Sequence, residues 1–421
     1  MIDLEYLKNN IEEYKKNLKD RQLKVEDFKL EEITKLYEEK KELTRQVQEI
    51  ERQRNLLTGR RQKQVDEKAK KLRSELQELE SKLREAGSVL ETLSMNLPNI
   101  ASPEVPVGKN EKDNIVMREV GEKRKFDFEP KDYLALAGWL VDMERGANVA
   151  GRRFAYLFGD LVLLEFALAK LAFDVLLPKG FIPVLPPVMI KPEVFSGMGR
   201  LGKGQEGERY FMPKDNLYLV GSAEHTIGPI HMNEILREDE LPKRYLGFST
   251  CFRREAGSYG KDTKGILRVH QFDKVEMFSF TTPEKSEEEH QFLLACQEEL
   301  IHKLELPYRV IQICTGDLGF TDWKQYDIET WMPGEGTYRE THSCSNTTDF
   351  QARGVNIKYR VQASSLKSQV RYVHILNATA FAIGRILIAI IENYQQKDGS
   401  IVIPKVLQSY VGKDRITNSA N

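Results

Sequence analysis

The stretch from residue 251 to residue 280 carries side chains that suit a bound nucleotide. Arg253 and Glu255 lie two residues apart after the apolar run YLGFSTCF, so an extended backbone would place both on one face. After a turn rich in Gly and Lys, a second alternating run carries Arg268, Phe272 and Glu276. The pattern predicts two antiparallel strands joined by a basic loop. Arginines on that face can bind phosphate, and a ring can cover a base. The alternative is a salt-bridged hairpin in an ordinary sheet.

Three segments resemble the signature motifs of class II aminoacyl-tRNA synthetases. The first is FIPVLPPVMIKP from Phe181, which is similar to a motif made of a helix and a proline-bearing strand. The second is FRRE with VHQFDKVE downstream, and the third is LNATAFAIGRILIAIIENYQ from Leu376, where Gly-Arg opens an apolar helix. Together with the segments SAEH and YRETHSCSN, these motifs most resemble those of the seryl-tRNA synthetase family. This resemblance covers nearly the whole chain and implies a serine–tRNA ligase, which makes seryl-adenylate from serine and ATP and then charges tRNA.

The resemblance implies an ATP site with named roles. Arg253 is expected to hold the α-phosphate and the serine carboxylate, while Arg268 and Arg385 neutralise the β- and γ-phosphates; these three are the expected catalytic residues. Phe272 would stack under adenine and Glu255 would accept from its amino group. The full expected ATP-binding set is Arg253, Arg254, Glu255, Val269, Phe272, Glu340, Thr341, His342, Ser343 and Arg385.

Magnesium is expected beside the phosphates, on the oxygens of Glu340 and Ser343, which are ligands that this ion prefers. Read alone, the ETHS segment is a commonplace polar loop; the resemblance favours the metal site. His342 stands where the family often has a serine, and no individual role is assigned to it.

The expected serine pocket draws on three separated segments. Carboxylates can hold an ammonium group, and a pocket that hydrogen-bonds a hydroxyl strongly rejects an amino acid that lacks one. Ser222 replaces the more usual threonine and Thr379 also keeps a hydroxyl, so serine remains the expected substrate. The predicted set is Ser222, Ala223, Glu224, Arg253, Glu276, Asn377 and Thr379.

Residues 30–94 predict a coiled-coil arm. Apolar residues recur at steps of three and four, and the pattern breaks at residues 58–62, where Gly59 favours a turn. Two helices of roughly 30 residues, each about 45 Å long, would fold back as an antiparallel hairpin.

The tip of this arm is strongly basic. Nine basic and two acidic residues lie between Arg52 and Arg73, although the whole chain of 421 residues has a net charge of −1. A solvated coiled-coil face usually alternates in sign, so the clustering favours phosphate contacts. The resemblance implies the long variable arm of serine tRNA, and by extension selenocysteine tRNA, as the partner. The predicted contacts are Arg52, Arg54, Arg60, Arg61, Lys63, Lys70, Lys71 and Arg73.

The chain length predicts two domains. We expect a helical arm over 1–100, a linker over 101–130 and a catalytic domain over 131–421. Helical patterns at 133–145 and 153–176, strands at 184–189, 245–253, 266–280 and 308–315, and a helix after Gly384 indicate an α+β fold. The resemblance makes this an antiparallel-sheet class II catalytic domain.

Compartment and assembly complete the expectations. Four scattered cysteines favour buried, reduced thiols, MIDLEYLKNN does not resemble a signal peptide, and a cytoplasmic enzyme is expected. The first motif implies a homodimer. One alternative is a ligase that charges a carrier protein or another acceptor, but such relatives generally lack a long basic arm. Another is a nucleic-acid-binding coiled coil with an inactive synthetase domain, which the retained motif residues disfavour.

Overall fold

The computed structural model describes residues 1–57, 63–202, 205–256, 264–362 and 369–418. The chain separates into two compact units, Met1–Pro98 and Asn99–Asn421. Among the described residues, no helix combines the length and apolar character needed to cross a membrane.

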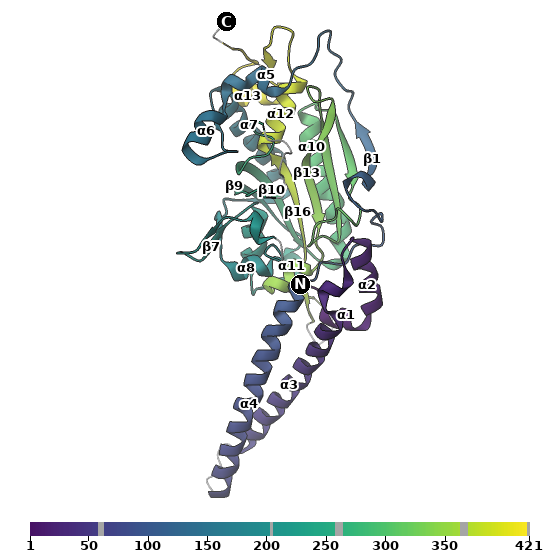
Figure 1. The fold of residues 1–421 in the computed structure, drawn as a ribbon, viewed down its shortest axis with the longest axis vertical. Helices are drawn as coiled ribbons and strands as arrows, with labels where there is room; N and C mark the ends of the chain where they lie inside the picture. Colours follow the sequence, from purple (N-terminus) through teal and green to yellow (C-terminus); the bar gives the residue numbers. More distant parts are fainter. Residues whose placement is uncertain (58–62, 203–204, 257–263, 363–368, 419–421) are drawn as a thin grey trace. The chain divides into compact units, whose positions relative to one another are not determined.

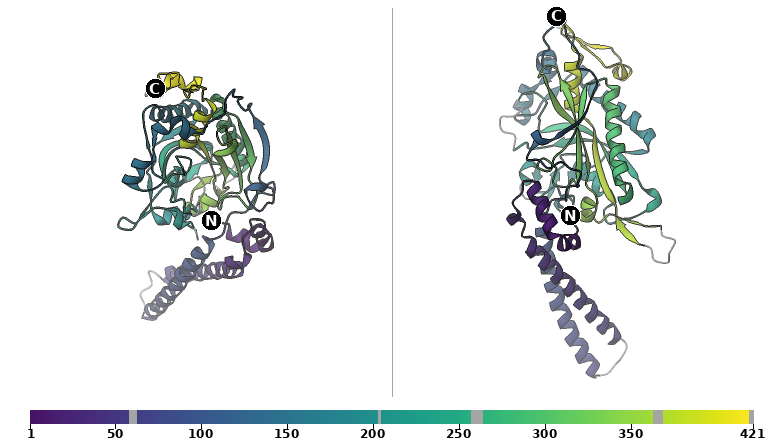
Figure 2. Two further views of the ribbon diagram at one scale, coloured as in Figure 1. Left: turned by 45° about the horizontal axis from the view of Figure 1, so that its top comes forward. Right: turned by 90° about the vertical axis from the view of Figure 1, so that its right-hand side faces the viewer.

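The N-terminal unit consists of two short helices and two long ones: α1 (Leu4–Asn9), α2 (Ile11–Asp20), α3 (Leu30–Leu57) and α4 (Lys63–Ser94). The long helices lie side by side and antiparallel (Figures 1 and 2). The seam between them is buried because the apolar residues recur on one stripe of each helix, as at Ile33, Leu43, Leu72 and Leu76. The predicted hairpin turn at 58–62 lies outside the described residues.

An eight-stranded sheet forms the centre of the second unit (Figure 1). In spatial order its strands are β1 (Ile115–Val120), β11 (Tyr308–Gln312), β12 (Lys324–Met332), β13 (Thr337–Asn346), β16 (His374–Ala382), β10 (Gln271–Thr281), β9 (Lys243–Phe252) and β4 (Phe181–Val184). Neighbours pair antiparallel except β4, which runs parallel to β9 at the sheet edge. The predicted α+β fold with an antiparallel catalytic sheet is confirmed.

Three helices cover one face of this sheet: α7 (Asp160–Leu176), α10 (Ser286–Lys303) and α12 (Ile383–Asn393). They share the main apolar core with odd-numbered β10 residues such as Val275 and Met277. Phe278 and Phe280 belong to a separate core cluster. Since strand side chains alternate between faces, Phe272 and Glu276 also lie on the face away from the helices.

The remaining elements are short. They are α5 (Tyr133–Ala137), α6 (Met143–Ala150), α8 (Pro192–Gly197), α9 (Glu224–Ile227), α11 (Phe350–Val355), α13 (Lys405–Val411), β2 (Val141–Asp142), β3 (Tyr156–Leu157), β5 (Met189–Ile190), β6 (Phe211–Met212), β7 (Leu217–Leu219), β8 (Ile235–Arg237), β14 (Lys358–Arg360), β15 (Val370–Tyr372), β17 (Ile401–Val402) and β18 (Arg415–Ile416).

Four of the predicted elements differ from the structure, and one of them, the strand expected at 266–280, begins only at Gln271. The strand expected at 184–189 is wrong, because β4 ends at Val184 and Pro186 and Pro187 cannot donate to a ladder. The helix expected at 133–145 is interrupted by β2, and the one expected from 153 begins only at Asp160, after Gly159 at φ 53°. The four cysteines are free and buried.

Candidate active site

The middle of the site is the face of β10 that points away from the helices. Phe272, Lys274 and Glu276 alternate along it. In the neighbouring strand β16, Thr379 lies directly opposite Glu276, and Asn377 lies two residues further along the same face. The sheet register therefore gathers candidates from two motifs that are about a hundred residues apart.

A turn, rather than a continuous strand, brings the arginines of the second motif together. β9 ends at Phe252 and β10 begins at Gln271, so the predicted extended run through Glu255 is wrong. Glu255 adopts a left-handed conformation at φ 51°, and its carboxylate accepts from Arg268 Nη1 at 2.6 Å. The Arg253 N–H donates to His270 O at 3.0 Å, which extends the pairing of the two strands by one residue.

Arg253 lies at the junction of the expected ATP and serine sites. Its guanidinium carbon is 5.3 Å from the centre of the Phe272 ring, and its Nε donates to Gly221 O at 3.0 Å. Gly221 directly precedes Ser222, the first residue of the expected serine pocket.

The Gly-Arg pair of the third motif opens α12 as predicted and contacts the expected metal-binding segment. Arg385 Nη1 donates to Glu340 O at 2.9 Å and lies 3.1 Å from a carboxylate oxygen of Glu340. Desolvation alone would raise the pKa of Glu340, but the charge and hydrogen bond of Arg385 lower it. Glu340 therefore stays ionised at neutral pH.

A β-bulge places the two expected magnesium ligands on one face. Three residues separate Glu340 and Ser343, which would put them on opposite faces of a regular strand. The register against β12 shifts so that Ser343 pairs with Asp327 and Glu340 pairs with Glu329, leaving Thr341 as the extra residue. A carboxylate and a hydroxyl consequently share a face, and both are oxygen donors of the kind that magnesium prefers.

The expected serine pocket is buried and holds an unused donor. Ser222 Oγ donates to Glu276 at 3.4 Å, and the side chains of Ser222, Glu276, Asn377 and Thr379 are all nearly inaccessible. The Asn377 Nδ2 group is buried without a hydrogen-bond partner. Because buried polar groups are normally satisfied, this amide is available to a polar ligand.

Glu224 differs from the expectation that its carboxylate is open to an ammonium group. It is buried, and it accepts from Arg200 Nε at 3.1 Å and from Gln351 Nε2 at 2.9 Å. Burial alone would raise the pKa of Glu224, but the charge of Arg200 lowers it. Glu224 is thus an ionised carboxylate with its own counterion.

The predicted tRNA contacts that the structure describes lie on the two long helices. Arg52, Arg54, Lys70, Lys71 and Arg73 are exposed. Arg60 and Arg61 lie outside the described residues, and Lys63 is the first residue of α4.

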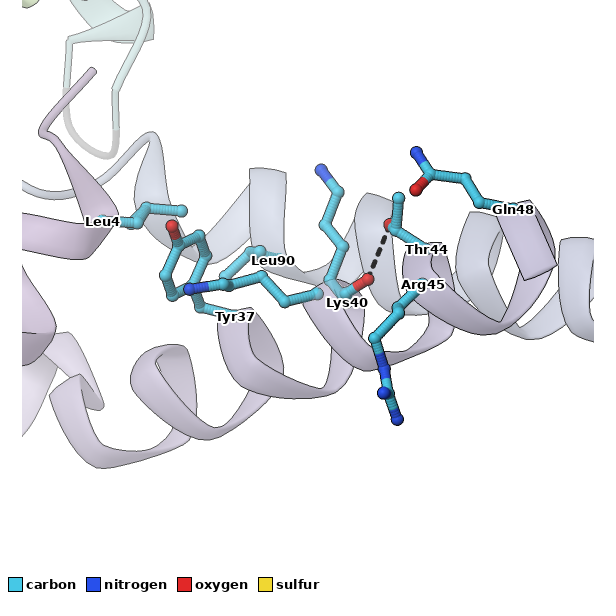
Figure 3. Close-up of a pocket in the computed structure, with 8 residues that line it drawn as sticks. Leu4, Tyr37, Lys40, Thr44, Arg45, Gln48 and Leu90 are labelled. Atoms are coloured by element: carbon cyan, nitrogen blue, oxygen red, sulfur yellow. Dashed lines mark hydrogen bonds between the residues drawn. The ribbon is translucent and has the colours of Figure 1, made fainter.

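Figure 3 shows a hollow on the same unit, between α1, α3 and α4. Tyr37 and Leu90 line it, with Lys40, Lys41 and Arg45 nearby. Tyr37 OH and Lys41 Nζ both bond Glu5, at 2.9 and 3.0 Å. The hollow therefore combines an aromatic ring with three cations, and two of these, Lys41 and Arg45, already have carboxylate partners in Glu5 and Glu42.

Comparisons with known proteins agree over both units. Residues 1–101 match the seryl-tRNA synthetase N-terminal domain, and residues 210–394 match the tRNA synthetase class II core domain (G, H, P, S and T). A serine–tRNA ligase of Dictyoglomus thermophilum is 51% identical over 322 residues, which are 76% of this chain and 75% of that protein. One of Thermobifida fusca is 49% identical, over 77% of this chain and 76% of that protein.

The chain belongs to the seryl-tRNA synthetase family. Two solved structures of the family show the same fold. The seryl-tRNA synthetase of Pyrococcus horikoshii complexed with ATP has a TM-score of 0.89 at 39% identity, covering 99% of each chain. The cytoplasmic serine–tRNA ligase of Naegleria fowleri in complex with AMP has a TM-score of 0.84 at 32% identity, covering 100% of this chain and 99% of that one. The predicted family and fold are therefore confirmed.

Two residues of the expected ATP-binding set, Thr341 and His342, have side chains that point away from the candidate active site. The Thr341 hydroxyl lies 2.7 Å from that of Thr330 inside the protein, and the His342 ring lies against Phe381 of the main core. Burial lowers the pKa of His342 to about 3, so the ring is neutral at physiological pH. These residues can offer a nucleotide only backbone atoms.

Three further members of the expected sets lie at the edges of the site. Val269 is buried in the main core and Ala223 in the smaller core cluster. Arg254 is exposed, with its guanidinium carbon 5.3 Å from the centre of the Tyr210 ring.

Two buried cations were missed by the sequence analysis. Lys274 forms an ion pair with Glu276, and both side chains are almost fully buried. Burial raises the pKa of Glu276, and the charge of Lys274 opposes that shift. The two-residue spacing on one strand face could have identified Lys274. Arg200, the counterion of Glu224, comes from a separate loop and gives no such signal.

Proposed function

We propose that this chain activates L-serine with ATP and transfers it to the 3′ end of serine tRNA. The observation that carries the proposal is the adjacency of two half-sites on one sheet face. Arg253 contacts the Phe272 ring on the nucleotide side and Gly221 on the amino acid side. Beyond Gly221 lie Ser222, Glu276 and the free amide of Asn377.

The first half-reaction joins the serine carboxylate to the α-phosphate. A carboxylate oxygen attacks the α-phosphorus, the bond to the bridging oxygen breaks, and pyrophosphate leaves. Such chemistry depends on positioning and on neutralising charge more than on covalent catalysis. Arg253 would hold the α-phosphate, and Arg268 and Arg385 the outer phosphates. Phe272 would stack on adenine, and Glu255 would accept from its amino group.

The second half-reaction uses the adenylate as an activated acyl group. A terminal ribose hydroxyl of the tRNA attacks the carbonyl carbon, and AMP leaves with the bonding electron pair. Arg253, placed beside the α-phosphate, would stabilise the charge that develops on AMP.

Magnesium fits the donor pair of Glu340 and Ser343. When bound, it neutralises charge on the phosphate oxygens. Arg385 already lies beside Glu340, so the ion and the guanidinium would act on neighbouring phosphate oxygens.

Serine selectivity would come from unsatisfied polar groups. An amino acid without a hydroxyl would leave the buried amide of Asn377 without a partner. Sites of this kind reject such analogues strongly, so alanine and glycine are expected to be poor substrates.

Serine-dependent exchange of pyrophosphate into ATP, followed by charging of serine tRNA, tests the proposal. Arg253→Ala should lower the exchange rate by about 10²-fold or more, as expected for the loss of one charge-stabilising group. Arg237→Ala is the matched control, since Arg237 is exposed and pairs with Asp239. Near-normal exchange in a folded Arg253→Ala enzyme would refute the site, and exchange without tRNA charging would point to another acceptor.

We assign the exposed basic residues of α3 and α4 to the tRNA backbone, because clustered lysine and arginine supply most of the affinity for nucleic acid. Selenocysteine tRNA would use the same acyl site, since serine is the group transferred in both cases. Charging assays with each purified tRNA test the two substrates separately. Supply of charged tRNA to translation places the enzyme in the cytoplasm, which cell fractionation checks.

A homodimer is proposed from the surface around the first motif. On α7, Leu163 and Phe166 are 45% and 64% exposed, and just after the edge strand β4, Leu185 is 80% exposed. Closed two-fold dimers are the commonest assemblies, and exposed apolar patches commonly mark interfaces. Sedimentation of a stable, active monomer would contradict this proposal.

A further inference from the structure

Within the described residues, the Arg209 guanidinium forms no ion pair, although the charges of Arg253, Arg200, Glu224 and Glu208 lie near it. It follows a short turn at Glu206–Glu208 and precedes β6. Its Nε is buried without a hydrogen-bond partner, and its guanidinium makes no ion pair in the described part of the chain. The Phe195 ring lies 5.5 Å from its guanidinium carbon.

The side chains of Arg209 and Arg253 both lie next to Gly221. A β-carbon on Gly221 would come within 2.9 Å of Arg209 Nη1 and 3.4 Å of Arg253 Cγ. Gly221 therefore lies between the side chains of Arg209 and Arg253, and a β-carbon there would displace the end of the Arg209 side chain. Because Gly221 precedes Ser222, Arg209 adjoins the expected serine pocket.

The other cations of the site have carboxylate partners. Arg200 pairs with Glu224, Lys274 with Glu276, Arg268 with Glu255, and Arg385 with Glu340. In the described residues, the Arg253 guanidinium bonds a backbone carbonyl and lies over a ring, and the Arg209 guanidinium forms no ion pair and has a buried Nε without a hydrogen-bond partner. The proposed reaction joins two anionic groups, a carboxylate and an α-phosphate. The guanidinium groups of Arg209 and Arg253, which form no ion pair in the described residues, are available to bind them.

Keeping Arg209 charged is unfavourable in the free protein. Burial and the nearby charges of Arg253 and Arg200 lower the pKa of Arg209 to about 10, yet it remains protonated at neutral pH. A partly buried cation without an ion pair destabilises a fold, and binding of an anion relieves that penalty.

We propose that Arg209 binds the carboxylate of serine, which leaves Arg253 to hold the α-phosphate. This inference rests on the proposed serine activation. An amino acid carries its carboxylate on the same carbon as its ammonium group, so the partner of the carboxylate must adjoin the groups that hold the rest of the molecule. Arg209 meets this condition through Gly221, next to Ser222 and its hydrogen bond to Glu276.

Pyrophosphate exchange with Arg209→Gln tests the inference. The KM for serine should rise about tenfold or more, the loss expected for one charge-assisted contact, while the KM for ATP stays within about twofold. Arg237→Gln serves as the matched control. A rise confined to ATP, or equal for ATP and serine, would overturn the assignment to the carboxylate.

Serinamide separates carboxylate binding from a general effect on the pocket. It keeps the ammonium and hydroxyl groups of serine but has no carboxylate. Its inhibition constant should therefore stay the same or fall in Arg209→Gln, because a repelling cation is gone. Equal weakening of serine and serinamide would overturn the inference.

Thermal stability distinguishes a ligand-binding arginine from a structural one. Arg209→Gln should melt at the wild-type temperature or above, whereas Arg200→Gln should melt lower because it removes the counterion of buried Glu224. A large drop in Tm for Arg209→Gln would refute the proposal. Absence of exchange in the wild type would instead refute serine activation itself, so the two failures are distinguishable.

Discussion

Replacing Lys274 by Met should reveal how strongly the lysine stabilises the buried carboxylate of Glu276. The two side chains form an ion pair and are 8% and 1% exposed. Methionine preserves most of the volume, so the main change is loss of the positive charge. Glu276 then has only the weak hydrogen bond from Ser222 at 3.4 Å.

The expected loss of stability depends on pH in a defined way. Breaking a buried pair typically destabilises by about 3–5 kcal/mol. Without Lys274, Glu276 can become neutral by taking up a proton. The free energy of that protonation sets an upper limit on the stability that the variant loses. For a carboxyl with an ordinary pKa of 4.5, the limit is about 3 kcal/mol at pH 7 and about 1 kcal/mol at pH 5. A carboxyl whose pKa is raised in the folded state contributes fully to folding stability below its unfolded pKa. That contribution is lost as the pH rises through the folded-state pKa.

Urea unfolding followed by tryptophan fluorescence measures this effect. Trp139, Trp323 and Trp331 are the tryptophans of the chain, and all lie in the unit Asn99–Asn421, so the signal reports on that unit. Lys274→Met should lose about 3 kcal/mol at pH 7 and about 1 kcal/mol at pH 5. The double variant with Glu276→Gln should recover most of the loss at pH 7. An equal loss at both pH values, or no recovery in the double variant, would refute the reasoning.

Three other predictions follow from single observations. Neutralising Lys70, Lys71 and Arg73 to Gln should weaken tRNA binding and lower the slope of log affinity against log salt by about 2–3, with pyrophosphate exchange unchanged; Lys112→Gln is the control. Burial raises the pKa of Glu392 to about 7, so its contribution to stability is lost between about pH 4.5 and 7, and Glu392→Gln should remove that dependence in urea unfolding. Phe166→Asp on α7 should shift sedimentation toward monomer, whereas Val149→Asp, also exposed, should not. An unaltered salt slope, an unaltered pH profile or an intact dimer would contradict the respective prediction.

Local periodicity predicted the parts of the fold that depend on neighbours in sequence. The coiled-coil seam appears as buried Ile33, Leu43, Leu72 and Leu76. The alternation of β10 places Phe272 and Glu276 on one face, and Gly-Arg opens α12 as expected. These patterns work because a residue's face follows from its spacing once the element type is known.

Features that depend on a single backbone conformation could not be predicted in the same way. The left-handed turn at Glu255 redirects a chain that otherwise reads as a strand. The bulge at Thr341 places Glu340 and Ser343 on one face although their spacing argues against it. Pro186 and Pro187, by contrast, were visible signals against a strand at 184–189.

Partners from distant segments determine the electrostatics of the site. Glu224 and Glu276 look equivalent in the sequence as acceptors for an ammonium group. In the structure, Glu224 accepts hydrogen bonds from Arg200 and Gln351, and Glu276 forms an ion pair with Lys274 on the same strand. Both carboxylates therefore have a buried counterion, and Glu276 in addition accepts a hydrogen bond from Ser222 Oγ in the expected serine pocket.

The cation–carboxylate pairs of the site orient its charged groups before the substrates bind. Four cations, Arg200, Lys274, Arg268 and Arg385, are fixed by carboxylates, which orients the groups around the substrates before they bind. Groups that are oriented in advance do not have to rearrange as charge develops in the transition state. The unpaired guanidinium groups of Arg253 and Arg209 leave a local positive excess, which favours two anionic substrates over one. Glu276 is the expected partner of the serine ammonium group, so the affinity for serine should weaken as the pH falls toward the raised pKa of Glu276, whereas the affinity for ATP should not follow that titration.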